Sequence, residues 1–132
     1  MARIITPEEA QRLIGEGTRY LDVRTVAEYE AGHPVSALNI PFVVQDPVSQ
    51  QMALNTNFLD LVAAHFPPEE TFIIACQAGG RSARASDMLE QMSYPDLLDM
   101  GDGYGGWEAC ELPVATGPDP ERGFEALKSR AG

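Results

Sequence analysis

Residues 71–89 read TFIIACQAGGRSARASDML and contain the pattern that decides the fold. The first five, TFIIA, are largely apolar on both faces, which is typical of a central strand in a parallel sheet covered by helices on both sides. A helix is predicted over residues 81–92, because apolar side chains recur there at helical spacing: Ala85, Met88, Leu89 and Met92. Cys76 therefore lies at the carboxyl end of a buried strand, where α/β folds bind their ligands.

Strand and helix patterns alternate along the rest of the chain. Two predicted helices begin with a capping box, in which Thr6 and Thr25 are the caps and Glu9 and Glu28 follow. The other expected elements are strands within residues 19–23, 36–42 and 96–100, a connecting loop over 43–55, a helix from Phe58 that ends before Pro67, and a short last helix within 104–111. This alternation predicts a parallel, doubly wound α/β domain.

Composition narrows the classes of function. The chain has 132 residues, 44% of them hydrophobic and 22% charged, which suffices for the core of one ordinary domain. Its 20 acidic and 9 basic residues give a formal charge of -11, and the arginines are scattered. Binding to nucleic acid or to an acidic membrane is therefore not expected. Any anion site must be built locally, from backbone amides and one or two arginines.

The N-terminal residues MARIITPEEA contain no apolar region of the roughly 7 residues that a secretory signal needs. No segment approaches the roughly 18 to 20 apolar residues of a membrane span. We therefore expect a soluble, cytoplasmic protein. In that reducing compartment, at least one of the two cysteines, Cys76 and Cys110, is expected to be a free thiol.

The loop after the buried strand has the composition of an anion cradle. Gly79 and Gly80 permit positive φ angles, which let consecutive amides curl around one atom. The predicted helix adds its N-terminal N–H groups, and Arg81 adds a positive charge. All of these favour a thiolate, so Cys76 is a candidate nucleophile. The alternative is a small buried cysteine before an ordinary turn, but a glutamine, two glycines and an arginine extend a core poorly.

No metal cluster and no serine, histidine and aspartate set competes with Cys76 in the sequence. His33 and His65 are isolated from each other, so we expect each to be structural or solvated. Trp107 is expected in the core. Cys110 is expected to be a packing residue in the last helix.

Three segments resemble the rhodanese superfamily. CQAGGRS is similar to its active-site loop, Cys-x-x-Gly-x-Arg-Ser, with Cys76, Gly79, Arg81 and Ser82 at the matching positions. YLDVRTVAEYEAGHPVSALNIPF resembles the family's N-terminal signature, and DMGDGYGGWEACELPV resembles its closing segment. The resemblance is strongest with single-domain thiosulfate sulfurtransferases. It implies a rhodanese-like domain over residues 1–116, while residues 117–132 form a C-terminal extension that we expect to be loosely packed, with a little helix at its end.

The resemblance also implies a fold and a chemistry. The fold is a single α/β domain with a doubly wound, mainly parallel five-stranded sheet flanked by helices. The chemistry is transfer of sulfane sulfur from thiosulfate or a persulfide donor, through a persulfide on Cys76, to cyanide, a low-molecular-weight thiol or a thioredoxin-like protein. No cofactor or metal is implied. The donor would bind to the loop residues Gln77, Ala78, Gly79, Gly80, Arg81 and Ser82.

Asp22 and Arg24 are interpreted as residues that brace this loop, with Glu28 as a possible partner of Arg24. A strand terminus and a capping box explain the same residues equally well. Arg84 is expected to matter less than Arg81 for donor binding.

Three rival functions remain. A phosphatase or arsenate reductase on the same scaffold would have one residue more between cysteine and arginine, and the four residues between Cys76 and Arg81 favour sulfur. A non-catalytic rhodanese-like interaction module commonly lacks the cysteine, which this chain retains. A persulfide relay between proteins would use the same loop, so the sequence leaves that alternative open.

Overall fold

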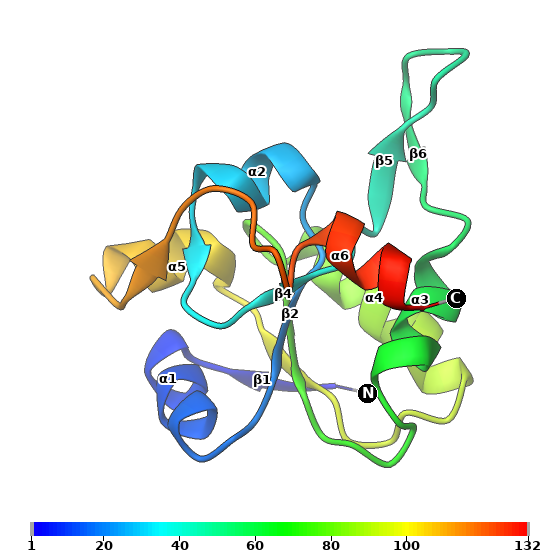
Figure 1. The fold of residues 1–132 in the computed structure, drawn as a ribbon. Coiled ribbons are helices and arrows are strands. Elements are labelled where there is room, and N and C mark those ends of the chain that lie inside the picture. Colours follow the sequence, from blue (N-terminus) through cyan, green and yellow to red (C-terminus); the bar gives the residue numbers. More distant parts are fainter. Residues whose placement is uncertain (1, 132) are drawn as a thin grey trace.

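The computed structural model describes residues 2–131, and a five-stranded parallel sheet runs through the middle of the domain (Figure 1). In spatial order its strands are β1 (Arg3–Ile5), β8 (Leu98–Met100), β7 (Ile73–Ala75), β2 (Tyr20–Asp22) and β4 (Leu38–Asn39). Every neighbouring pair is parallel. The predicted fold class is therefore confirmed, and the fully buried β7 is the central strand, as its apolar sequence predicts.

Helices cover both faces of the sheet (Figure 1). On one face lie α1 (Pro7–Gly15) and α5 (Gly103–Ala109); on the other lie α3 (Phe58–His65), α4 (Gly80–Gln91) and α6 (Phe124–Arg130). The short α2 (Val26–Ala31) follows the carboxyl end of β2. The longest of these helices has 12 residues. Within residues 2–131, no helix is long and apolar enough to cross a membrane.

Both predicted capping boxes are present. The Thr6 hydroxyl accepts the Glu9 N–H at 3.1 Å, and the Glu9 carboxylate accepts the Thr6 N–H at 3.0 Å. Thr25 and Glu28 form the same pair of bonds, at 3.2 and 3.1 Å, at the start of α2. Each box satisfies two N–H groups that a helix N-terminus leaves free.

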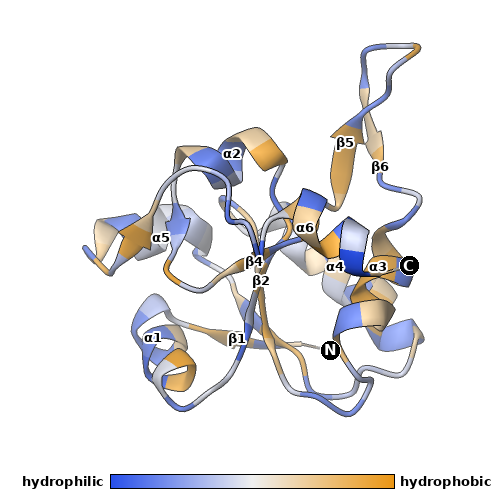
Figure 2. Ribbon diagram, in the orientation of Figure 1, coloured by the Kyte–Doolittle hydropathy of each residue, from blue (hydrophilic) through white to orange (hydrophobic). Residues whose placement is uncertain are grey.

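Residues 43–55, which the sequence predicts to be a connecting loop, form an antiparallel hairpin instead. Its strands are β5 (Val43–Gln45) and β6 (Met52–Leu54), and it projects from the body of the domain (Figure 1). The Asp46 carboxylate accepts the N–H groups of Val48 and Ser49 at 2.8 and 3.0 Å, which fixes the turn. The prediction was wrong because most of the polar residues that suggest a loop, Asp46, Ser49, Gln50 and Gln51, lie in the turn between the two strands. Figure 2 shows the hydrophobic colouring of β5 and of the hairpin tip.

The C-terminal segment ends in the predicted helix, but it is not loosely packed. Its Leu127 is 1% exposed and belongs to the core beneath α3 and α4. The Asn39 N–H donates to the Arg122 carbonyl at 2.9 Å, so this segment covers the free edge of β4. A small antiparallel pair, β3 (His33–Pro34) with β9 (Val114–Ala115), leads into the segment. The domain boundary near residue 116 stays a prediction.

Candidate functional site

Cys76 follows β7 directly, and the chain turns through the next three residues into α4. The turn is completed by Gly79, whose φ of 107° is left-handed and which is the N-cap of α4. A Cβ at Gly79 would lie 2.6 Å from the Gly101 carbonyl oxygen, so this position excludes any side chain. Gly80 is the first residue of the helix and has no positive φ. The expected use of positive φ therefore holds for Gly79 and is wrong for Gly80.

The Cys76 sulfur lies inside this turn and is surrounded by hydrogen-bonding groups. Its residue is 2% exposed, and the Gly79 N–H donates to Sγ at 3.0 Å. The Cys76 thiol in turn donates to the Ser82 hydroxyl oxygen at 3.7 Å. Burial raises the pKa of Cys76, but hydrogen bonds from Ser82 and from the Gly79 and Ala78 amides outweigh it, and the pKa is lowered overall. The loop thus favours the thiolate.

Cys110 has the opposite environment. It is the C-cap residue of α5 and is half-buried. Its sulfur lies 3.4 Å from a Glu8 carboxylate oxygen. Partial burial and this carboxylate both raise the pKa of Cys110. Both cysteines are free, and only Cys76 is held in a form suited to nucleophilic attack.

A buried ion pair lies beside the loop. Arg24 and Asp22 are 2% and 1% exposed, and the shortest of their hydrogen bonds is 2.6 Å. The same guanidinium donates to the Gln77 side-chain oxygen at 3.2 Å and to the Gly32 carbonyl at 2.7 Å. Arg24 therefore connects β2, α2 and the cysteine loop, and this geometry supports the predicted bracing role of the pair.

Tyr104 of α5 supports the same arrangement from the other side. The Arg24 guanidinium carbon lies 4.2 Å from the centre of the Tyr104 ring. The Tyr104 N–H donates to the Cys76 carbonyl at 2.8 Å, and the Gly105 N–H donates to the Gln77 carbonyl at 3.2 Å. The closing segment of the sequence therefore holds the loop backbone, a role that the sequence interpretation missed.

Arg81 binds Glu28 rather than standing free. Two parallel hydrogen bonds of 2.7 and 3.0 Å join the guanidinium of Arg81 to the carboxylate of Glu28. Glu28 was expected to pair with Arg24, and that expectation is wrong because Arg24 is held by Asp22 inside the domain. The hydrogen bonds from Arg81, opposed by partial burial and helped by the capping-box bonds, lower the pKa of Glu28 to about 2. The charge of Arg81 is thus largely compensated.

Ser82 connects the cysteine to a residue that the sequence interpretation missed. Its hydroxyl donates to the Asp99 carboxylate at 2.9 Å and lies 3.1 Å from the Gly79 carbonyl. Asp99 belongs to β8 and is 3% exposed. A signal was present in the sequence, because an aspartate within a strand read as apolar must find a buried partner.

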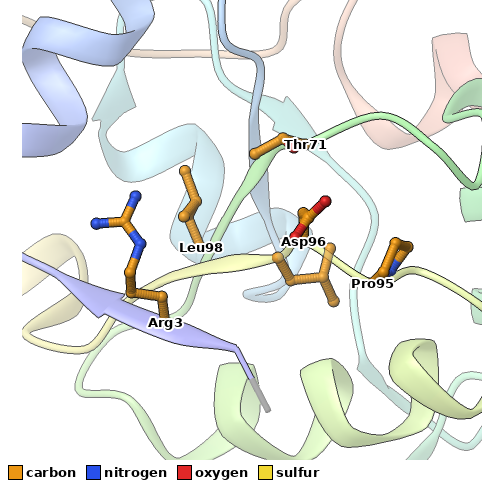
Figure 3. A pocket seen from close by; sticks show the side chains of 6 residues that line it. Arg3, Thr71, Pro95, Asp96 and Leu98 are labelled. Atoms are coloured by element: carbon orange, nitrogen blue, oxygen red, sulfur yellow. The ribbon is translucent and has the colours of Figure 1, made fainter.

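Two pockets lie at opposite ends of the domain, and only one of them is near the cysteine loop. One, of about 420 Å³, lies between the start of α2 and the projecting hairpin and has mostly apolar walls: Thr25, Val26, Ala27, Pro41, Val43, Val44, Gln45 and Met52. It is adjacent to the capping box whose Glu28 binds Arg81. The other, of about 350 Å³, lies at the amino ends of β1, β7 and β8 and includes Arg3, Asp96 and Thr71 (Figure 3). That end of the sheet is opposite to Cys76, so it is not the candidate site.

The predicted structural residues lie where expected. His33 is 2% exposed, its Nδ1 lies 2.6 Å from the Tyr29 carbonyl, and its ring stacks on Tyr29 at 3.7 Å. His65 Nε2 lies 2.8 Å from the Leu127 carbonyl. Trp107 is 2% exposed in the core. Within residues 2–131 there is no cluster of three or more residues of the metal-ligating types.

A parallel α/β sheet with a cysteine held by amides at the carboxyl end of its central strand, and with four residues between that cysteine and the arginine of the turn, is the arrangement of a rhodanese-type domain. The model of the family described as Rhodanese-like domain matches residues 6–110. The chain therefore belongs to the rhodanese-like domain family.

Similar proteins agree with this assignment. The chain is 39% identical over 105 residues to rhodanese-like domain-containing protein 15, chloroplastic, of Arabidopsis thaliana, covering 80% of this chain and 57% of that protein. It is 36% identical over 105 residues to thiosulfate sulfurtransferase 16, chloroplastic, of the same plant, covering 80% and 86%. The crystal structure of the Alr3790 protein from Anabaena sp. has a TM-score of 0.72 at 14% identity, covering 96% of this chain and 88% of that one, which supports the fold alone.

The chain thus spans little more than half the length of some of these relatives. Several of the similar proteins bear the name thiosulfate sulfurtransferase. The cytoplasmic location stays a prediction.

Proposed function

We propose that this protein is a sulfurtransferase that moves sulfane sulfur from thiosulfate or a persulfide to a thiophilic acceptor, through a persulfide on Cys76. The acceptor class is cyanide, a low-molecular-weight thiol or a thioredoxin-like protein. The observation that carries the proposal is the position of the Cys76 sulfur, which is buried in the turn before α4 and accepts the Gly79 N–H at 3.0 Å. Such hydrogen bonds favour the thiolate, and the pKa of Cys76 is lowered in spite of burial. An interaction module that does no chemistry has no use for such a thiolate.

The proposed transfer has two steps. In the first, the Cys76 thiolate attacks the outer sulfur of thiosulfate, an S–S bond forms, and sulfite leaves with the electron pair of the bond that breaks. In the second, the acceptor attacks the outer sulfur of the persulfide and Cys76 leaves as a thiolate. The turn from Gln77 to Ser82 is suited to both steps, since N–H groups fixed in advance stabilise negative sulfur without rearrangement.

A second candidate donor is a protein or small-molecule persulfide, and one observation favours it. The only arginine in the cysteine turn, Arg81, is paired with Glu28. A dianionic donor such as thiosulfate would meet a largely compensated charge there, in a protein of formal charge -11. A persulfide carries less charge and would be affected less. The relay between proteins therefore remains a candidate role for the same site.

Intact-mass measurement tests the proposal. The protein is incubated with thiosulfate, freed of excess donor and weighed; one added sulfur per chain is expected, and cyanide should remove it. Cys76→Ser should lose the adduct and turnover, whereas Cys110→Ser should keep both. An adduct mapped to Cys110, or turnover by Cys76→Ser, would refute the mechanism. Comparing thiosulfate with a persulfidated cysteine desulfurase as donor then separates the two candidates, and 3-mercaptopyruvate is expected to fail.

A further inference from the structure

Asp99 is a buried carboxylate on the face of the sheet that α4 covers. It lies in the middle of β8, and its register partners on the neighbouring strands, Ile4 and Ile74, are apolar. The Ser82 hydroxyl is its hydrogen-bond partner, at 2.9 Å. Within residues 2–131, no arginine, lysine or histidine forms an ion pair with it. An ionised carboxylate without a cation in such a place is costly, so the hydroxyl that it contacts is informative.

That partner also contacts the nucleophile. Ser82 Oγ lies 2.9 Å from Asp99 Oδ1, 3.1 Å from the Gly79 carbonyl and 3.7 Å from Cys76 Sγ. A hydroxyl has a single proton and can donate to one of these groups at a time. When Asp99 is ionised, it accepts a hydrogen bond from the Ser82 hydroxyl, and the Ser82 oxygen accepts one from the Cys76 thiol. When Asp99 is protonated, it can donate to Ser82, and the Ser82 hydroxyl is free to donate to a Cys76 thiolate.

We propose that Asp99 is a positioning residue that takes up the proton of Cys76 through Ser82 when the thiolate forms. The Cys76 S–H bond breaks and its proton passes to Ser82 Oγ, while the former Ser82 proton passes to Asp99 Oδ1. The total charge of the site is unchanged, because one negative charge moves from a carboxylate without a cation to a sulfur held by amides. When a thiol re-forms, the two protons move back. The inference rests on the proposed role of Cys76 as nucleophile.

The surroundings agree with such an exchange. Burial raises the pKa of Asp99, Ser82 lowers it, and Asp87 on α4 raises it, with a net increase. The pKa of Cys76 is lowered, so the two values are brought toward each other. The other charged or titratable groups that act on the cysteine are Arg81 on α4 and Tyr20 on β2. In the described part of the chain, the residue that contacts both Asp99 and Cys76 is Ser82.

The pH dependence of Cys76 alkylation by iodoacetamide tests the proposal, in a Cys110→Ser background. Two coupled groups lose their protons in two separate steps, and the alkylation rate follows the thiolate. The wild-type profile should therefore rise in two steps, and Asp99→Asn should show one. Ser82→Ala should slow alkylation near neutral pH by about tenfold, equal to one unit of pKa. Asp96→Asn, an exposed acid just before β8, is the matched control and should keep both steps.

A single step in the wild type, or two steps in Asp99→Asn, would overturn the proposal. Because Asp99→Asn could fail to fold, a second measurement uses the wild-type side chains. Alkylation removes the charge from sulfur, so Asp99 should ionise and the infrared band of a protonated carboxyl group should weaken. No change in that band would also overturn the proposal. The sulfur-adduct measurement keeps the two ideas apart: an adduct on Cys76 with no coupling to Asp99 refutes the relay and leaves the sulfurtransferase intact.

Discussion

Arg81 and Glu28 form a two-point ion pair across the mouth of the cysteine turn, with distances of 2.7 and 3.0 Å. Arg81 is the second residue of the helix that follows the nucleophile, and Glu28 belongs to the capping box of α2. The pair joins two segments that lie 53 residues apart in the chain. The pair therefore ties α2 to the first turn of α4. It also compensates the positive charge of Arg81, which the loop sequence suggested would attract an anionic donor.

Releasing Arg81 should improve the use of an anionic donor. Glu28→Gln keeps the capping box, because glutamine serves there as well as glutamate, but it cannot neutralise Arg81. We expect kcat/KM for thiosulfate to rise by about threefold to tenfold, which corresponds to about 1 kcal/mol. Arg81→Ala should lower it, since Glu28 would then face the donor alone. Activity with a persulfide donor is the control and should change less in both variants. Equal kcat/KM for thiosulfate in all three proteins would leave the pair purely structural.

The pair should also make stability depend on pH in one direction. The pKa of Glu28 is lowered from the ordinary glutamate value of 4.5 to about 2 by its hydrogen bonds to Arg81. A carboxyl group whose pKa is lower in the folded state than in the unfolded state stabilises the fold. This contribution is complete at pH values above the pKa in the unfolded state and is lost as pH falls toward the pKa in the folded state. The stability difference between wild type and Glu28→Gln should therefore be constant from about pH 7 down to about 5 and shrink toward pH 2. Urea denaturation at several pH values measures it, and a difference that grows on acidification would contradict the assignment.

Gly79 should tolerate no side chain, and Gly17 supplies a matched comparison. Both have left-handed φ angles, of 107° and 102°, but a Cβ at Gly17 would meet no atom within 4 Å. Gly17→Ala should therefore cost only backbone strain, about 1 to 2 kcal/mol. Gly79→Ala adds a clash with the Gly101 carbonyl, so we expect a loss of about 3 kcal/mol or more and at least a tenfold drop in kcat/KM. Chemical denaturation and the transfer assay distinguish the two; equal losses would mean that the loop can relax.

The elements that the sequence predicts well are those with a local cause. Capping boxes depend on residues three positions apart, and a strand buried on both faces has a continuous apolar sequence, as residues 71–75 show. β1 was missed for the opposite reason. Its Ile4 is 66% exposed, and this edge strand gains its regularity from pairing with β8, a partner far along the chain. The hairpin of β5 and β6 was likewise hidden, because both strands have only three residues and β6 is exposed.

The site divides in the same way. Cys76 and the glycine turn could be predicted because all of their signal lies within a few residues. The partners of the charged side chains could not be predicted, because the sequence does not show which charged residues lie close together in the fold. Glu28 was the partner suggested for Arg24, and only the fold shows that Asp22 binds Arg24 and that Glu28 reaches Arg81. The contact between Asp99 and Ser82 could not be predicted either, because it depends on how α4 packs against β8.

The buried pair of Arg24 and Asp22 gives the last prediction. Arg24→Met should destabilise the fold by about 3 to 5 kcal/mol, because it leaves the Asp22 carboxylate buried without its cation. It should also slow sulfur transfer, since the Gln77 side chain loses its donor at 3.2 Å. Asp22→Asn in the same chain should restore part of the stability, because a neutral amide is cheaper to bury than a lone carboxylate.

Gln77→Ala is the control that separates these two effects. It removes only the contact to the loop, so it should leave the ion pair intact, cost much less stability and still slow transfer. The deficit of Arg24→Met should shrink in acid, where Asp22 takes up a proton: burial already raises the pKa of Asp22, and losing Arg24 raises it further. Urea denaturation across pH and the transfer assay measure both effects. If Arg24→Met were as stable as wild type, or if its loss of stability grew in acid, Arg24 would not be compensating the buried charge of Asp22.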